Sequence, residues 1–255
     1  MTERLKLRAV VLRTVDSGES DRVVTLLALG RGKLAAYARG ARASKKRFAG
    51  ALEPFTLVDA ELSGRQGADL LRLESAMVER SFHAIRGDLA RIACAAYAVE
   101  LARELTRDHE PHDELLELLV DYLGRLDAAP AAPAMLRAWE LGALAAAGFQ
   151  PRLDACARCG APAPEDGAAF SPPDGGVLCA ACAAQGQGGL VLLSAAGLAA
   201  LRRLQAGGLG AGEAPLEPAA GRESKEALGR FLTHLLGHRL QARKFLDEVG
   251  HLLAE

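Results

Sequence analysis

Hydrophobic and polar residues alternate along much of the first 80 residues, which is the period of a strand with one buried face. Leu71 and Leu73, for example, alternate with Arg72 and Glu74. Strand-like runs lie near residues 6–15, 22–29, 33–38, 55–60 and 71–78. Turn-forming residues separate them at 16–20, 30–32 and 63–67. Five short strands in this length predict a small closed barrel, of which the OB-fold is the common nucleic-acid-binding example.

After Ser81 the apolar period changes from two to about 3.6, as expected for amphipathic helices. Apolar faces predict helices near residues 85–99, 115–126, 134–147, 198–204, 228–236 and 240–249. Gly148 is suited to end the third of these helices, and Ser194 is suited to cap the start of the fourth. Residues 207–221 are rich in Gly, Ala and Pro and predict a flexible connection.

Two cysteine pairs interrupt the helical half, Cys156-x-x-Cys159 and Cys179-x-x-Cys182. Two thiolate pairs at this separation can bind Zn²⁺ tetrahedrally. Residues 170–176 between the pairs predict a strand and a tight turn, which together make a zinc ribbon. Four sulfur ligands leave no coordination position for water or substrate, so the predicted zinc is structural.

Other roles for the cysteines fit the sequence less well than structural zinc. Redox dithiols of the thioredoxin kind require a strand-to-helix junction in a βαβ unit, and neither pair has that setting. A hydrolytic metalloenzyme would need a non-cysteine ligand or a bound water on the metal. Cys94 lies in an alanine-rich helical stretch, so we expect it to pack in the core.

These patterns predict an α+β, multidomain chain: an N-terminal five-stranded OB-type β-barrel and a C-terminal α-helical domain interrupted by a zinc ribbon with four cysteine ligands. The expected segments are the barrel at 1–81, the first helical part at 82–152, the ribbon at 153–189 and the second helical part at 190–255.

Composition and motifs exclude several functional classes. The 255 residues are 50% hydrophobic and 25% charged, as in an ordinary soluble protein. The N-terminus is charged, and no apolar run reaches membrane-spanning length, so we expect a cytoplasmic protein without membrane contact. Gly30-Arg31-Gly32-Lys33 lacks the earlier glycine and the hydroxyl residue of a phosphate loop, so it predicts a β-turn. The sequence contains no catalytic signature, and we expect a protein that is not an enzyme.

Positive charge is concentrated near the N-terminus. The chain has a net charge of −1, but residues 1–80 contain 15 lysines and arginines against 10 aspartates and glutamates. Between Asp21 and Glu53 there are eight cations and no acidic residue, which suits a polyanion. The alternative is a solvated loop that protects a sheet edge. With only 4% aromatic residues, binding should depend on phosphate contacts and be weakly sequence-selective.

The N-terminal part of the chain contains a series of short motifs, which are Ala9-Val10-Val11-Leu12-Arg13, Gly18-Glu19-Ser20-Asp21-Arg22-Val23-Val24, Gly32-Lys33, Arg39-Gly40-Ala41-Arg42 and Leu52-Glu53-Pro54-Phe55. In order and spacing they resemble the RecO family of bacterial DNA repair proteins. The segment Leu236 to Leu246 is similar to the family's closing helix, and the cysteine pairs match its zinc-bearing members. The resemblance covers nearly the whole chain, although the helical middle matches only in pattern.

The resemblance implies a recombination mediator that acts at the nucleoid during repair. Such a protein binds single- and double-stranded DNA, anneals complementary strands and, with the partner RecR, helps load the recombinase onto DNA coated with single-stranded-DNA-binding protein. At matching positions, DNA contact would come from Lys33, Arg39, Arg42, Lys45, Lys46 and Arg47.

The family also docks the acidic C-terminal tail of the single-stranded-DNA-binding protein on its helical domain. For that tail, local charge on the last helix suggests Arg239, Arg243 and Lys244. A zinc-ribbon OB-fold protein that binds RNA or the ribosome is the alternative, because it would share the barrel and the charge asymmetry.

Overall fold

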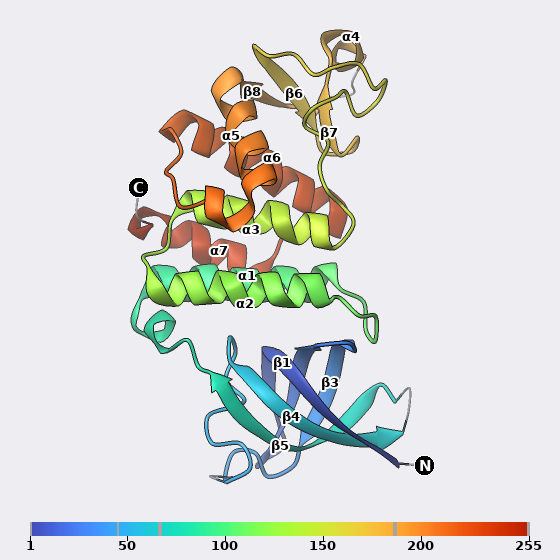
Figure 1. Cartoon of the computed structure of the whole chain (residues 1–255), viewed down its shortest axis with the longest axis vertical. Coiled ribbons are helices and arrows are strands. Elements are labelled where there is room, and N and C mark those ends of the chain that lie inside the picture. Colours follow the sequence, from blue (N-terminus) through green and yellow to red (C-terminus); the bar gives the residue numbers. More distant parts are fainter. Residues whose placement is uncertain (1, 45, 66–67, 186–187, 254–255) are drawn as a thin grey trace. The chain divides into compact units, whose positions relative to one another are not determined.

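The computed structural model describes residues 2–44, 46–65, 68–185 and 188–253 (Figure 1). The chain divides into two compact units, Met1–Ala129 and Pro130–Glu255. In its described residues the first unit thus contains two α-helices and a short 3₁₀ helix as well as the barrel. The predicted division into four segments differs from this clustering and stays a prediction.

Five strands in the first unit form a closed barrel with the order β1-β2-β3-β5-β4 (Figure 1). They are β1 (Thr2–Ser17), β2 (Asp21–Ala28), β3 (Gly32–Ala38), β4 (Leu57–Arg65) and β5 (Leu70–Arg80). β3 and β5 pair in parallel, whereas the other neighbours are antiparallel. β1 closes the barrel because its first half pairs with β4 and its second half with β2. The predicted five-stranded barrel is confirmed.

One predicted turn of the barrel was wrong. The expected turn at 63–67 begins too early, since β4 continues through Ser63 and Gly64 to Arg65. Pairing explains the difference: β1 and β4 stay hydrogen-bonded out to the Thr2–Arg65 pair. The rest of that predicted turn, Gln66 and Gly67, lies outside the described residues.

Three helical elements complete the first unit. They are the 3₁₀ helix η1 (His83–Gly87), α1 (Leu89–Leu105) and α2 (Asp113–Ala128). Asp88 caps α1 by accepting a hydrogen bond from the Arg91 amide. Cys94 is fully buried on α1, as expected for a packing residue.

In its described residues the second unit combines four longer helices with a small sheet. Its helical elements are α3 (Pro133–Ala146), α4 (Ala180–Ala184), α5 (Ala195–Ala211), α6 (Pro218–Leu236), α7 (Gln241–Glu248) and η2 (Gly250–Leu252). The sheet has the order β7-β6-β8, formed by β6 (Gly167–Ser171), β7 (Gly176–Leu178) and β8 (Val191–Ser194). The predicted caps are confirmed: Ser194 Oγ accepts from the Gly197 amide, and Gly148 has a positive φ just after α3.

The predicted flexible connection at 207–221 was wrong for most of its length. α5 continues to Ala211 through a kink at Gly208, and α6 begins at Pro218. Leu209 and Ala220 are buried, so packing stabilises helix where composition favoured a loop. Among the described residues, no helix is both long enough and apolar enough to cross a membrane.

Candidate nucleic-acid interface and metal centre

Most of the predicted DNA-binding residues lie on one segment, residues 39–56, which connects β3 to β4 and is called the basic loop here. Apolar residues anchor this loop, because Phe48 and Leu52 are only 2% and 3% exposed and belong to the barrel core. The Ala76 amide of β5 donates to the Arg47 carbonyl at 2.9 Å, and Thr14 Oγ1 of β1 donates to the Leu52 carbonyl at 2.5 Å. These contacts hold the described parts of the basic loop in place before any ligand binds.

Asp21, the first residue of β2, fixes the start of the basic loop. Its carboxylate accepts hydrogen bonds from the Tyr37 hydroxyl, from the Gly40 amide at 2.6 Å and from the Ser20 hydroxyl at 2.8 Å. These donors, Tyr37 foremost, lower the pKa of Asp21 to about 2. The group therefore stays ionised at neutral pH and keeps Gly40 in position.

The turn between β1 and β2 also holds Arg42. The Arg42 amide donates to the Ser20 carbonyl at 3.0 Å, and its guanidinium Nη1 donates to the Glu19 carbonyl at 3.1 Å. Neither contact neutralises the charge. Within the described part of the chain Arg42 forms no salt bridge, so its guanidinium can pair with an external anion.

Four of the predicted cations are brought together on the basic loop. Arg39, Arg42 and Lys46 are exposed. Arg47 is half-buried, donates to the Arg39 carbonyl at 2.5 Å and lies over the Phe48 ring, 4.8 Å from its centroid. Lys45 lies outside the described residues.

Lys33 is separated from this group and has a structural role. Its ammonium donates to the carbonyls of Arg103 and Thr106 at 2.9 and 2.8 Å, and it lies 3.4 Å from a carboxylate oxygen of Asp108. The side chain is only 18% exposed. It thereby satisfies carbonyls at the C-terminal end of α1, where a cation is favourable. We leave Lys33 out of the proposed interface for this reason.

The turn before Lys33 packs closely against the segment between α1 and α2. The Gly30 amide donates to the Asp113 carboxylate at 2.7 Å. A Cβ at Gly32 would lie 1.8 Å from the Glu110 carbonyl oxygen, so only glycine fits there. The predicted β-turn at Gly30-Arg31-Gly32 is confirmed, and the sequence that superficially resembles a phosphate loop serves to pack the barrel against these helices.

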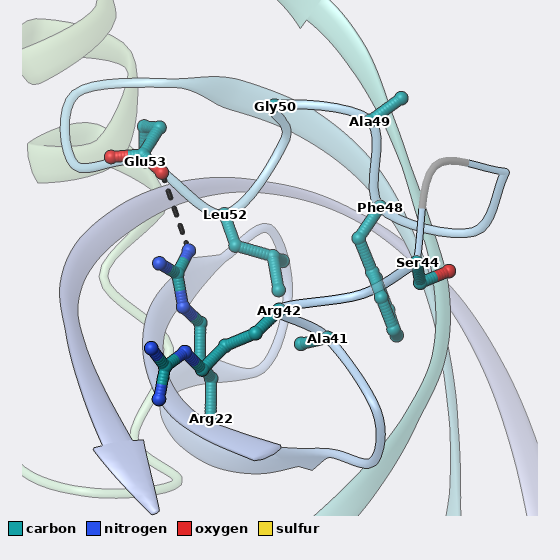
Figure 2. Close-up of a pocket in the computed structure, with 9 residues that line it drawn as sticks. All are labelled: Arg22, Ala41, Arg42, Ser44, Phe48, Ala49, Gly50, Leu52 and Glu53. Carbon is teal, nitrogen blue, oxygen red and sulfur yellow. Dashed lines mark hydrogen bonds and ion pairs between the residues drawn. The ribbon is translucent and has the colours of Figure 1, made fainter. Parts of the chain in front are cut away.

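A cavity of about 470 Å³ lies beside the basic loop (Figure 2). It is lined by Arg22, Ala41, Arg42, Ser44, Phe48, Ala49, Gly50, Leu52 and Glu53. Sequence reasoning counted Arg22 in the basic stretch but assigned no individual role to Arg22, Asp21 or Glu53. A usable signal was present, since all three lie within the motifs quoted above and Asp21 and Glu53 are the acidic residues that border the basic stretch.

The four cysteines of the second unit form one cluster. Their sulfur atoms all lie within 4.8 Å of one another, and those of Cys159 and Cys179 are 3.7 Å apart. In a tetrahedral site with Zn–S bonds of about 2.3 Å, neighbouring sulfurs are about 3.8 Å apart. Donor type and spacing therefore fit a Zn²⁺ ion held by Cys156, Cys159, Cys179 and Cys182.

Backbone N–H groups near the cluster stabilise the thiolate form of Cys156. Burial alone would raise the pKa of the Cys156 thiol, but the backbone N–H groups of Cys159, Cys179 and Arg158 outweigh burial and lower that pKa to about 6. Metal binding requires thiolates, so this environment favours it.

Arg158 links the parts of the ribbon around the cysteines. It makes a bidentate pair with Asp174 at 3.1 and 2.9 Å and donates to the Cys182 carbonyl at 3.1 Å. Asp174 also accepts from the Ser171 hydroxyl at 2.5 Å. The first cysteine pair, the β6–β7 turn and the second pair are thus fixed to one another, as an outer shell around a metal site should be.

The three residues suggested for a partner's tail are in different environments. Arg239 and Lys244 are exposed. Arg243 is not free, because it pairs with Asp247 at 3.3 Å, lies 3.9 Å from Glu140 and has a side chain only 12% exposed. Its surroundings are those of a structural ion pair.

The closed barrel, the exposed cations of the basic loop and the four-cysteine cluster define a class of protein, a metal-binding barrel protein with a surface suited to a polyanion such as nucleic acid. Comparison with known proteins identifies the family. Residues 1–82 match the family described as Recombination protein O N terminal, and residues 86–244 match Recombination protein O C terminal. The chain therefore belongs to the RecO family of DNA repair proteins, which are non-enzymatic recombination mediators.

Relatives match along nearly the full length of the chain. The DNA repair protein RecO of Anaeromyxobacter sp. (strain K) is 64% identical, with 98% of this chain and 99% of the relative covered. The RecO proteins of Myxococcus xanthus and Roseiflexus sp. are 46% and 37% identical. Those matches cover 97% of this chain in both cases and 99% and 87% of the relatives.

Proposed function

We propose that the protein binds single- and double-stranded DNA through its basic loop, anneals complementary strands and helps load the recombinase onto DNA coated with single-stranded-DNA-binding protein. The observation that carries this proposal is the preformed loop with Arg39, Arg42, Lys46 and Arg47, together with membership of a mediator family. Lys45 belongs to the proposed set by sequence.

A basic loop that is ordered before DNA arrives binds a polyanion at a lower entropy cost. Ordering a flexible cationic loop would cost conformational entropy at the moment of binding. Here the Asp21 contacts, the Arg42 contacts and the buried Phe48 have already ordered most of that segment. Cations held close together raise the local potential and release counterions from the strand they contact.

Titration of labelled oligonucleotides tests the DNA assignment. Single-stranded DNA, duplex DNA and RNA of equal length are compared by fluorescence anisotropy for the intact protein and for a variant with Arg39, Arg42, Lys46 and Arg47 changed to Ala. We expect the variant to lose most DNA affinity. Unchanged affinity would remove the basic loop from the interface, and a clear preference for RNA would favour the alternative of an RNA- or ribosome-associated protein.

We further propose RecR and the acidic tail of the single-stranded-DNA-binding protein as partners. Arg239 and Lys244 are the candidates for the tail, since both are exposed cations near α7. A peptide of the tail should bind less tightly to the Arg239→Ala/Lys244→Ala variant. Equal binding would place the tail site elsewhere. Arg230→Ala is a matched control, because it removes an exposed cation of α6 that pairs with Glu226.

For the cysteine cluster we propose a structural zinc ion. The strands beside the cluster are short: β6, β7 and β8 contain five, three and four residues. Hydrophobic burial alone gives such a small sheet little stability. A tetrahedral ion held by both cysteine pairs would tie the ribbon together and would contribute to its folding free energy.

A further inference from the structure

The cavity beside the basic loop combines three kinds of chemistry (Figure 2). Its volume, about 470 Å³, is in the range of sites that hold small ligands. Phe48 and Leu52 line it with the small part of their side chains that is exposed, Arg22 and Arg42 supply guanidinium groups, and Glu53 supplies a carboxylate. The occupant should therefore be partly apolar and should carry both an anion and a hydrogen-bond donor.

Arg22 and Arg42 line the same cavity but differ in electrostatic state. Arg22 Nε lies 3.1 Å from Asp16 Oδ1, and its Nη1 lies 3.3 Å from Glu53 Oε1. Two carboxylates already compensate its charge, so what Arg22 offers is a planar guanidinium on which a ring can stack. Arg42 bonds only to backbone carbonyls in the described chain, so it retains a charge for a phosphate.

The Glu53 carboxylate disfavours a cavity ligand that is only an anion. Its side chain is 50% exposed, and Arg22 is the one described residue that forms an ion pair with it. A carboxylate has about four acceptor positions, so Glu53 can accept further hydrogen bonds. It would repel a phosphate but attract an amino group. The acceptor therefore selects for a ligand with an N–H donor.

The geometry points to a binding site for one unstacked nucleobase that carries an exocyclic amino group. We propose that its ring stacks on the Arg22 guanidinium, that its amino group donates to Glu53 and that its phosphate contacts Arg42. This inference rests on the proposed function, since the base belongs to the strand bound by the basic loop.

The site predicts a base preference added to otherwise unselective phosphate binding. Cytosine presents an N4 amino donor, for which Glu is a suitable acceptor, whereas thymine presents an O4 acceptor and a methyl group at the corresponding positions. A carboxylate facing O4 is repulsive. Oligonucleotides of cytosine should therefore bind more tightly than oligonucleotides of thymine.

The test compares oligo(dC) with oligo(dT) of equal length at neutral pH and one salt concentration, by fluorescence anisotropy. We expect the intact protein to prefer oligo(dC) by about five- to tenfold, near the lower end of what direct recognition of a base edge provides. In the Glu53→Gln variant, affinity for oligo(dC) should fall toward that for oligo(dT), because an amide is a weaker acceptor and can also donate to O4.

Asp16→Asn is the matched control. Asp16 is the other carboxylate that pairs with Arg22, but it does not line the cavity. This variant should keep the preference for oligo(dC), and thermal unfolding should show that both variants are folded.

Two outcomes would overturn the inference while leaving the proposed function standing. One is equal affinity of the intact protein for the two oligonucleotides with strong, salt-dependent binding to both. The other is a preference that survives in Glu53→Gln. Failure to bind either oligonucleotide would instead refute the proposed function and the inference together.

Discussion

The salt dependence of DNA binding should separate Arg42 from Lys33, although both are cations of the same family motifs. Arg42 is exposed and forms no salt bridge in the described chain, whereas Lys33 caps α1 with an ammonium only 18% exposed. We predict that Arg42→Ala weakens DNA binding without unfolding the protein. Lys33→Ala should destabilise the protein without changing its phosphate contacts.

The magnitude follows from the number of described cations on the basic loop that contact phosphate. If Arg39, Arg42, Lys46 and Arg47 each neutralise one phosphate of a single strand, log K should fall against log salt with a slope near −3, from roughly 0.7 per contact. Arg42→Ala should bring the slope to about −2. Across an approximately fourfold rise in salt, the intact protein should lose about 50-fold in affinity and the variant about 20-fold.

Lys33→Ala leaves the Arg103 and Thr106 carbonyls at the C-terminal end of α1 without their ammonium donor, which should cost about 1–3 kcal/mol in the free energy of unfolding. The assay is an anisotropy titration over a salt series for all three proteins, paired with urea unfolding. A reduced slope for Lys33→Ala would show that Lys33 contacts phosphate. An unchanged slope for Arg42→Ala would refute the reasoning about the loop.

Three further predictions concern the supports of the fold and of the site. Cys159→Ser should lower the zinc content of the purified protein. Acidification should release zinc from the intact protein, because the ligands must be thiolates. Full zinc occupancy in the variant, found by elemental analysis, would contradict the cysteine site. Asp21→Asn should speed amide hydrogen exchange at Gly40. Because the pKa of Asp21 is lowered to about 2, the stabilisation by its carboxylate should be complete at neutral pH and should be lost as the pH falls from about 4 toward 2. Equal exchange at Gly40 in the intact protein and in the variant would count against the Asp21 contacts. Gly32→Ala should lower the melting temperature far more than Gly30→Ala. Both glycines have a positive φ, but only a Cβ at residue 32 would clash with the Glu110 carbonyl. Equal effects of the two substitutions would show that backbone strain alone matters.

Local patterns were sufficient to predict most of the elements. Alternation of apolar residues placed β3 to within a residue of its observed bounds, because each strand of a small barrel has one face in the core. The cysteine spacing predicted the cluster, since two short turns and a hairpin bring the four sulfurs together without help from distant residues. Ser194 was a reliable cap because capping depends only on the adjoining amides.

Contacts between distant residues account for what could not be predicted. Lys33 is a capping residue because β3 packs beside the end of α1, about 70 residues later in the chain. Arg243 is an ion-pair residue because its helix brings it near Glu140 of α3. Residues 207–221 are mostly helical because Leu209 and Ala220 reach a core that their local composition does not indicate. No local period carries such information.

Strand annealing on DNA coated with single-stranded-DNA-binding protein tests the central claim most directly. Complementary strands are coated with single-stranded-DNA-binding protein and mixed with the intact protein or with the variant in which Arg39, Arg42, Lys46 and Arg47 are changed to Ala. Annealing is followed by the quenching of a fluorophore pair, one on each strand. We predict that the intact protein accelerates annealing and that the folded variant does not. If the variant anneals coated strands at the rate of the intact protein, the basic loop of the barrel is not the surface through which this protein acts on DNA.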